Sequence, residues 1–174
     1  MKRAINWGGK LDNLLETYRN QPHLTPKLDR LGSTIFDQEI INEIVLWKVN
    51  RYSLLSPNAL SMLNSTGNIE PGAHRKARPV LGALLDEPGV DLAMASTFLR
   101  FRNPDAFQIV DRHAYRAVYG KKYPLYSKSS ADEKIELYFG YLDELIKLAR
   151  SRKVKFKTLD RVLYLFDKQE NGKL

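Results

Sequence analysis

The chain has 174 residues, 43% of them hydrophobic, and a formal net charge of +8 at pH 7. This length and apolar content are sufficient for a packed domain and argue against disorder, and the positive balance favours nucleic acid, before an anionic membrane surface, as partner. The sequence contains no cysteine, which excludes disulfides, thiolate metal sites and an iron–sulfur cluster.

Apolar residues recur at the three- and four-residue spacing of amphipathic helices along almost the whole chain, and strand patterns are poor. Asp37 and Ser56 are suitable N-caps for two of the expected helices. Two prolines interrupt the helical pattern in the segment QPHLTP (21–26). The sequence therefore predicts an all-α protein with helices over 10–20, 38–53, a short stretch from 57, 79–86, 92–102, 112–119, 131–150 and 158–168.

Residues 87–91, Glu-Pro-Gly-Val-Asp, separate two of these helices. Pro88 ends the first helix, Gly89 permits a tight turn, and Asp91 is a suitable N-cap for the second helix. Backbone N–H groups at the start of a helix can bind a phosphate, because the helix dipole is positive there. The same pattern also suits an ordinary loop.

An apolar segment ends at Asp111, which is followed by Arg112, His113 and, one turn later, Arg116. Asp111 can be the N-cap of the helix over 112–119. Alternatively, its carboxylate can stabilise the positive charge that develops on a sugar when an N-glycosidic bond breaks. The two arginines are candidates for phosphate contacts or for solvated surface charges, and His113 suits a helix surface.

Together the two segments resemble the helix-hairpin-helix DNA glycosylase superfamily, the enzymes of base-excision repair. That family combines an L-P-G-V-G hairpin and a helix rich in small residues with an apolar-V-D-x-H-x-x-R segment further along. This chain has E-P-G-V-D at 87–91, A-M-A-S-T-F-L at 93–99 and I-V-D-R-H-A-Y-R at 109–116, with the same spacing. The resemblance covers about residues 85–120.

The resemblance implies a single two-lobed all-α domain, 1–174, that binds double-stranded DNA and hydrolyses an N-glycosidic bond. A central lobe over about 36–119 would carry the hairpin at 86–92, and 1–35 with 120–174 would form the second lobe. Asp111 would be the catalytic carboxylate, and neither a metal nor another cofactor is implied. The residues expected to contact DNA are Gly89, Val90, Asp91, Leu92, Arg112, His113 and Arg116.

Two positions depart from the family pattern. Asp91 stands where the family has its second hairpin glycine, and a solvated carboxylate there would repel a phosphate by roughly 1 kcal/mol. Ala93 stands where bifunctional members carry the lysine that forms a Schiff base, so the resemblance implies a monofunctional enzyme. Asp91 favours the alternative of a non-catalytic DNA-binding protein with the same fold.

A glycosylase also needs aromatic faces for a base rotated out of the duplex. Trp47, with Arg51 and Tyr52, is a weak candidate for this base pocket, as are Phe98 and Phe101. Core packing is the competing role for each aromatic residue, and none of them identifies which base is recognised.

Two segments are strongly basic. Residues 72–79, GAHRKARP, lie between glycine and proline, and residues 151–174 carry seven Lys or Arg against three acids. Each segment suits either a solvated surface or contact with a DNA backbone. If the positive charge has no role in binding nucleic acid, the remaining interpretation is a helical module that binds another protein. The sequence does not indicate which protein that would be.

No apolar stretch reaches the ~18 residues of a membrane span. The N-terminal segment lacks the apolar core of a signal peptide. The sequence therefore favours no membrane partner and a cytoplasmic location, or one in the nucleoid or nucleus.

Overall fold

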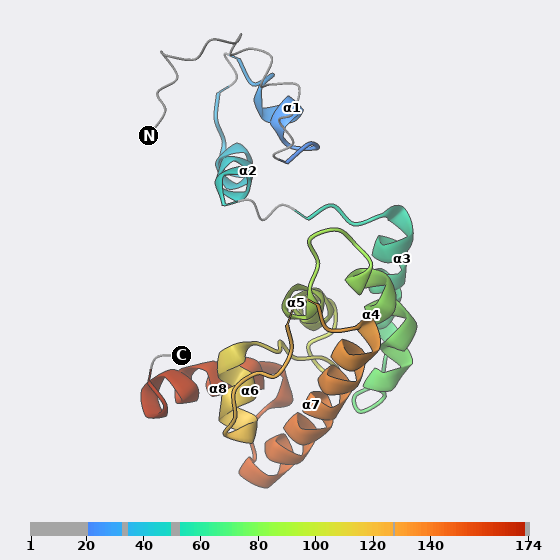
Figure 1. Cartoon of the computed structure of the whole chain (residues 1–174), viewed down its shortest axis with the longest axis vertical. Helices are drawn as coiled ribbons and strands as arrows, with labels where there is room; N and C mark the ends of the chain where they lie inside the picture. Colours follow the sequence, from blue (N-terminus) through green and yellow to red (C-terminus); the bar gives the residue numbers. More distant parts are fainter. Residues whose placement is uncertain (1–20, 33–34, 50–52, 127, 173–174) are drawn as a thin grey trace. The chain divides into compact units, whose positions relative to one another are not determined.

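The computed structural model describes residues 21–32, 35–49, 53–126 and 128–172 (Figure 1). Their regular structure is entirely helical, without a strand, which confirms the expected all-α class. The helices are α1 (Thr25–Leu28), α2 (Gln38–Lys48), α3 (Pro57–Ser65), α4 (Arg78–Leu85), α5 (Leu92–Arg102), α6 (Arg112–Tyr119), α7 (Ala131–Arg152) and α8 (Leu159–Glu170). None of these described helices is long and apolar enough to cross a membrane.

The expected N-caps are confirmed. The Asp37 carboxylate accepts a hydrogen bond from the Ile40 amide at 2.9 Å, and the Ser56 hydroxyl accepts one from the Ala59 amide at 3.2 Å. Each side chain thereby satisfies an amide that has no partner within its own helix.

Some helix boundaries differ from the prediction. The one-turn helix α1 begins at Thr25, inside the segment 21–26 that the prolines were expected to interrupt. Pro26 is compatible with this helix because it occupies the first turn, where no amide donor is needed. Helix α2 ends at Lys48 rather than at 53. The helix expected over 10–20 lies outside the described residues.

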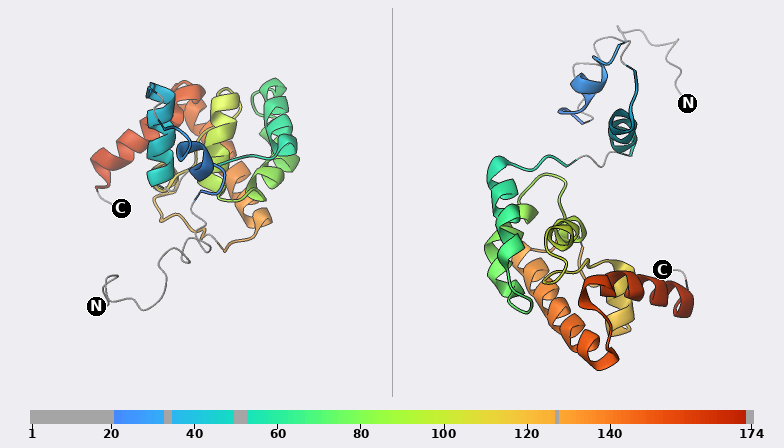
Figure 2. Two further views of the ribbon diagram at one scale, coloured as in Figure 1. Left: turned by 90° about the horizontal axis from the view of Figure 1, so that it is seen from above. Right: turned by 180° about the vertical axis from the view of Figure 1, so that it is seen from behind.

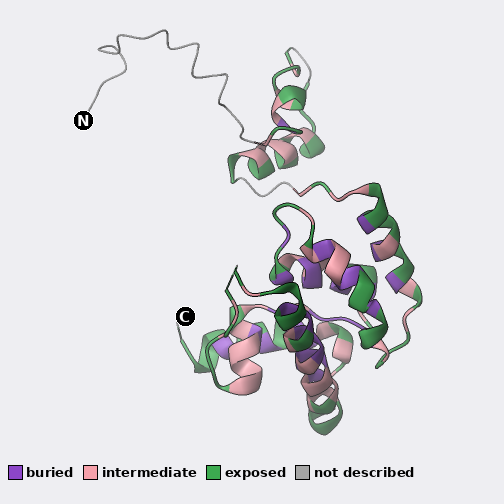
Figure 3. Ribbon diagram, turned by 45° about the vertical axis from the view of Figure 1, so that its right-hand side comes forward, coloured by how far each residue is buried: buried purple, intermediate pink, exposed green. Residues whose placement is uncertain are grey.

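The chain divides into two compact units, Met1–Tyr52 and Ser53–Leu174. In the first unit, the Trp47 indole N–H donates to the Thr25 hydroxyl at 2.9 Å, and no residue of α2 is buried (Figure 3). The expected division into a lobe over 36–119 and a lobe of 1–35 with 120–174 stays a prediction.

Helix α7 forms much of the core of the second unit. It packs against α4, α5 and α6, and α4 and α5 also contact each other. Burying a large apolar side chain contributes about 1.5–3 kcal/mol, so this shared core is what holds the helices together. The fully buried large side chains of the second unit are Tyr138, Tyr141, Phe107, Phe139, Leu81, Leu84, Leu92, Leu99, Leu142, Leu145 and Leu159.

Segment 107–110 crosses this core in an irregular conformation between α5 and α6. Buried backbone polar groups need hydrogen-bond partners. The Tyr138 and Tyr141 hydroxyls of α7 provide them, donating to the carbonyls of Gln108 at 2.9 Å and Ile109 at 3.1 Å. Beyond this segment the chain enters α6, which lies alongside α8 (Figure 2).

Candidate active site

A tight turn joins α4 to α5. The Val90 amide donates to the Glu87 carbonyl at 3.1 Å, and Gly89 has a φ of 78°. Pro88 and Gly89 occupy the two central positions, as a type II turn requires, because only the second needs a positive φ. A helix, a tight turn and a second helix therefore follow one another where the sequence predicts them.

Two amides of this turn already have acceptors. Val90 donates within the turn, and Leu92 donates to the Asp91 carboxylate at 2.8 Å. The side chains of Val90 and Leu92 are also buried. Among the described residues no acceptor is found for the N–H groups of Gly89 and Asp91. Those two amides are therefore the ones that a phosphate could bind.

The Asp91 carboxylate has a second partner within the fold. The Lys134 ammonium of α7 lies 2.9 Å from Asp91 Oδ1, with the Lys134 side chain 11% exposed and the Asp91 side chain 58% exposed. The carboxylate therefore compensates a cation that is nearly removed from water. Its negative charge nevertheless remains at the surface beside the turn.

Asp111 is the N-cap of α6, as one interpretation of the sequence expected. Its Oδ1 accepts a hydrogen bond from the Ala114 amide at 2.7 Å. Within the described part of the chain, Oδ2 has no hydrogen-bond partner. Burial raises the pKa of Tyr141 well above its ordinary value, and the nearby Asp111 charge adds to this effect. A neutral phenol thus supports the loop that leads to the carboxylate.

Asp111 also lies at the wall of a pocket of about 300 Å³. This volume is at the lower end of the ~300–1,000 Å³ typical of small-molecule sites. The other lining residues are Ile109, Asp160, Arg161, Tyr164 and Leu165. Four of them belong to the first two turns of α8, so the pocket lies between that helix and the segment that ends in Asp111.

The cations that follow Asp111 have a partner on α8. Arg116 Nε and Nη2 donate to Asp167 Oδ1 and Oδ2, both at 2.8 Å, and His113 Nδ1 lies 2.7 Å from Oδ2. The Asp167 side chain is fully buried, whereas those of Arg116 and His113 are 17% and 23% exposed. The Arg116 hydrogen bonds hold the pKa of the Asp167 carboxyl well below its usual range. DNA contact by His113 and Arg116 stays a prediction.

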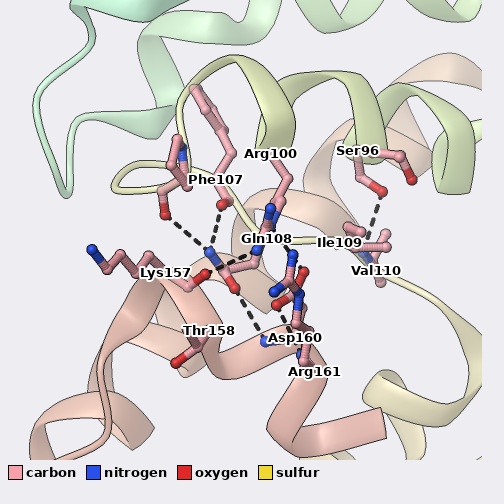
Figure 4. A network of polar contacts seen from close by, with 12 residues as sticks. Ser96, Arg100, Phe107, Gln108, Ile109, Val110, Lys157, Thr158, Asp160 and Arg161 are labelled. Atoms are coloured by element: carbon pink, nitrogen blue, oxygen red, sulfur yellow. Dashed lines mark hydrogen bonds and ion pairs between the residues drawn. The ribbon is translucent and has the colours of Figure 1, made fainter.

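A second polar network fastens the start of α8 to the loop before Asp111 (Figure 4). The fully buried Gln108 accepts a hydrogen bond from the Asp160 amide at 3.1 Å, while its side-chain nitrogen donates to two carbonyls of its own loop. Arg100 Nε of α5 lies 3.2 Å from Asp160 Oδ2, and Arg100 Nη2 donates to the Lys157 carbonyl at 3.1 Å. Buried contacts therefore hold α8 both at its start, through Asp160, and near its C-terminal end, through Asp167.

The structure describes only some of the remaining residues that were predicted to form a base pocket or to contact DNA. Trp47 lies in the first unit, and its partners Arg51 and Tyr52 lie outside the described residues. Arg112 is exposed and forms no ion pair within the described ranges. The roles of these residues in a base pocket and in DNA contact stay predictions.

The basic segment 72–79 is held against α7. Arg75 pairs with Asp143 at 2.7 Å, and Arg78 pairs with Asp132 at 3.0 Å. His74 is buried, and this burial lowers its pKa. Much of the charge of this segment is thus compensated by acids of α7.

The C-terminal basic segment is more positive at its surface than its composition indicates. Two of its three acids, Asp160 and Asp167, are buried, and only Glu170 is exposed. The exposed cations of its described part are Arg152, Lys153, Lys155, Lys157, Arg161 and Lys168. This arrangement favours contact with a polyanion over a neutralised surface.

The contribution of α8 to the pocket was not predicted from the sequence. One available signal was the seven-residue separation of Asp160 and Asp167, which places both on the helix face that also buries Leu163. Acids on an apolar face require partners, since an unpaired buried charge is costly. Tyr164 carried no comparable signal, because aromatic residues at helical spacing are usually part of a core.

No family model, curated protein or solved structure matches this chain. The likeness to the glycosylase superfamily therefore rests on the hairpin and the Asp111 segment. Function has to be inferred from the chemistry of the site.

Proposed function

We propose that the chain is a monofunctional DNA N-glycosylase of the base-excision repair type, with Asp111 as its catalytic carboxylate. The observation that carries this proposal is the position of Asp111. One oxygen caps α6, the other has no partner among the described residues, and the residue lines a pocket. It also follows a helix, turn and helix that can bind a DNA phosphate.

Hydrolysis of an N-glycosidic bond breaks the bond between the base and C1′ of the deoxyribose, with water forming the new bond to C1′. The sugar acquires oxocarbenium character, which a carboxylate held in place can stabilise. The Ala114 amide fixes one oxygen of Asp111, leaving the other for the cationic sugar or the attacking water. Losing one preorganised group of this kind typically reduces kcat ~10²–10³-fold.

Affinity for duplex DNA would come from the turn at Gly89, from Arg112 and from the exposed cations of the C-terminal segment. Each phosphate neutralised by Lys or Arg releases counterions, so the affinity should fall steeply as salt rises and depend little on sequence. Titration of a labelled undamaged duplex at increasing salt measures this slope. A complete lack of binding at low salt would contradict any DNA-binding function.

A non-catalytic DNA-binding protein is the second candidate. The observation in its favour is the exposed Asp91 carboxylate beside the turn, which weakens a phosphate site. The two candidates differ in their need for a charge at Asp111. Asn caps a helix about as well as Asp, so Asp111→Asn should keep the fold and remove only the charge.

The test is a screen of base release from duplexes that each carry one damaged or mismatched base. We expect Asp111→Asn to lose at least ~100-fold in release on the substrate found. Asp37→Asn is the matched control, because it makes the same change at the N-cap of α2. An Asp111→Asn variant as active as the wild type would refute the catalytic role.

A second measurement needs no known substrate. A duplex carrying a protonated pyrrolidine in place of one sugar mimics the cationic transition state, and an uncharged tetrahydrofuran serves as reference. Transition-state mimics bind at least ~100-fold more tightly than ground-state ligands, and we expect a preference that Asp111→Asn abolishes. Equal binding of both duplexes by the wild type, without base release, would establish the non-catalytic candidate.

A further inference from the structure

We infer that α8 forms the nucleobase-binding wall of the pocket at Asp111, with the Tyr164 ring as the surface on which an unpaired base stacks. This inference rests on the proposed function and names the part of the site that contacts the base. The inferred wall belongs to α8, the C-terminal helix of the second unit, whereas the weak candidates from the sequence were Trp47, Phe98 and Phe101.

The chemistry of the pocket lining suits a nucleobase. Ile109 and Leu165 provide apolar surface, Tyr164 provides an aromatic ring, and Arg161 provides donors for the oxygen and nitrogen acceptors at a base edge. Enzymes that act on an extruded base hold it by stacking and by hydrogen bonds to its edge. Asp111 at the same wall would lie near the sugar attached to that base.

The orientation of the Tyr164 ring is set by its neighbours. The His113 ring meets it edge-on, with centroids 5.0 Å apart and planes at 78°. The Lys168 ammonium lies 3.4 Å from the Tyr164 hydroxyl. His113 is itself held by the buried Asp167. The tyrosine, 37% exposed, is therefore a partly open surface with a fixed direction.

The same contacts relate this surface to Asp111. His113 and Arg116 belong to the helix that Asp111 caps, and both bind Asp167 of α8. A catalytic carboxylate and a binding surface must keep a constant separation for the sugar and base to be positioned together. The H-x-x-R part of the Asp111 segment thus positions α8 relative to the carboxylate.

The test compares two duplexes that differ only in the presence of one unpaired base. The first carries 2-aminopurine opposite a tetrahydrofuran residue, and the second carries tetrahydrofuran at both positions. An unpaired base is easily extruded, and stacking of one base on an aromatic side chain should favour the first duplex by about tenfold. Fluorescence anisotropy of a dye on the duplex end gives both affinities.

We expect Tyr164→Ala to abolish this preference and Tyr164→Phe to retain it, because phenylalanine keeps the aromatic ring. The matched control is Phe166→Ala, which removes an aromatic side chain that is 49% exposed on the same helix but does not line the pocket. Circular dichroism of each variant checks that the helices are intact.

A Tyr164→Ala variant that keeps the preference, or a wild type without one, would overturn this inference. The pyrrolidine preference can still depend on Asp111 in that case, which leaves the proposed function standing. Conversely, a Tyr164-dependent preference without any effect of Asp111 would retain the base-binding wall and refute the catalytic proposal.

Discussion

Replacing Asp167 tests the contact that joins α8 to α6. The side chain of Asp167 is fully buried and accepts hydrogen bonds from Arg116, from His113 and, at 2.8 Å, from Asn171. Asp167→Ala removes the acceptor for all three and leaves two cationic or ionisable groups facing each other. Asp167→Asn keeps the shape and part of the hydrogen bonding but removes the charge.

The expected loss of stability on replacing Asp167 follows from the burial of its ion pairs. Removing one partner of a buried ion pair costs ~3–5 kcal/mol when the other partner stays out of water. Here Arg116 and His113 keep 17% and 23% exposure, so water can replace part of what is lost. We therefore expect Asp167→Ala to lower the free energy of unfolding by about 2–4 kcal/mol, and Asp167→Asn by about 1–3 kcal/mol.

The Asp167 carboxyl should make the protein less stable as the pH falls. The pKa of Asp167 is lowered in the folded state, chiefly by the Arg116 hydrogen bonds. A carboxyl whose pKa is lowered by folding stabilises the folded state. This stabilisation is fully present above the pKa of the unfolded state, ~3.9, and is lost as the pH falls through the pKa of the folded state. Wild-type stability should therefore fall below about pH 5 by an amount that Asp167→Asn does not show.

Urea unfolding followed by far-ultraviolet circular dichroism measures both effects. Both tryptophans of the chain, Trp7 and Trp47, precede Ser53, so neither belongs to the unit that contains Asp167, and circular dichroism is the appropriate probe. Glu170→Gln is the matched control, because it removes an exposed carboxylate from the same helix. An Asp167→Ala variant within about 0.5 kcal/mol of the wild type would behave as a surface substitution and refute the reasoning.

Further predictions concern the turn and its helices. Asp91→Gly should raise duplex affinity by up to roughly tenfold, because it removes a surface charge that repels phosphate by ~1 kcal/mol and releases the Lys134 ammonium. Unchanged or weaker binding in a titration would mean that the turn does not contact DNA. Borohydride treatment with an abasic duplex should trap no covalent adduct, since Ala93 offers no amine, and an adduct would reveal another reactive lysine. In thermal unfolding, Gly89→Ala should cost ~1–2 kcal/mol because of its positive φ, whereas Gly82→Ala within α4 should stabilise by ~0.5–1 kcal/mol. Equal effects of these two substitutions would contradict the turn geometry.

Local patterns were sufficient for much of the fold. Helix α5 occupies the predicted residues, and α6 begins directly after Asp111, because apolar spacing and N-caps act over a few residues. The turn at Gly89 was equally predictable, since proline and glycine restrict the backbone locally. Asp111 could be identified as a helix cap and as a candidate catalytic group from its own neighbourhood in the chain.

The surroundings of Asp111 depended on tertiary structure. Arg116 and His113 follow Asp111 by a few residues, and the resemblance implied that both contact DNA. In the structure both bind Asp167, which is more than fifty residues away. Tyr164 lines the pocket for the same reason: the packing of α8 on α6 decides which faces of the two helices meet. Helical periodicity states which side of each helix is apolar, but it does not say which helix will cover it. Only the packed core brought a carboxylate, an arginine and a tyrosine from two distant segments to one pocket.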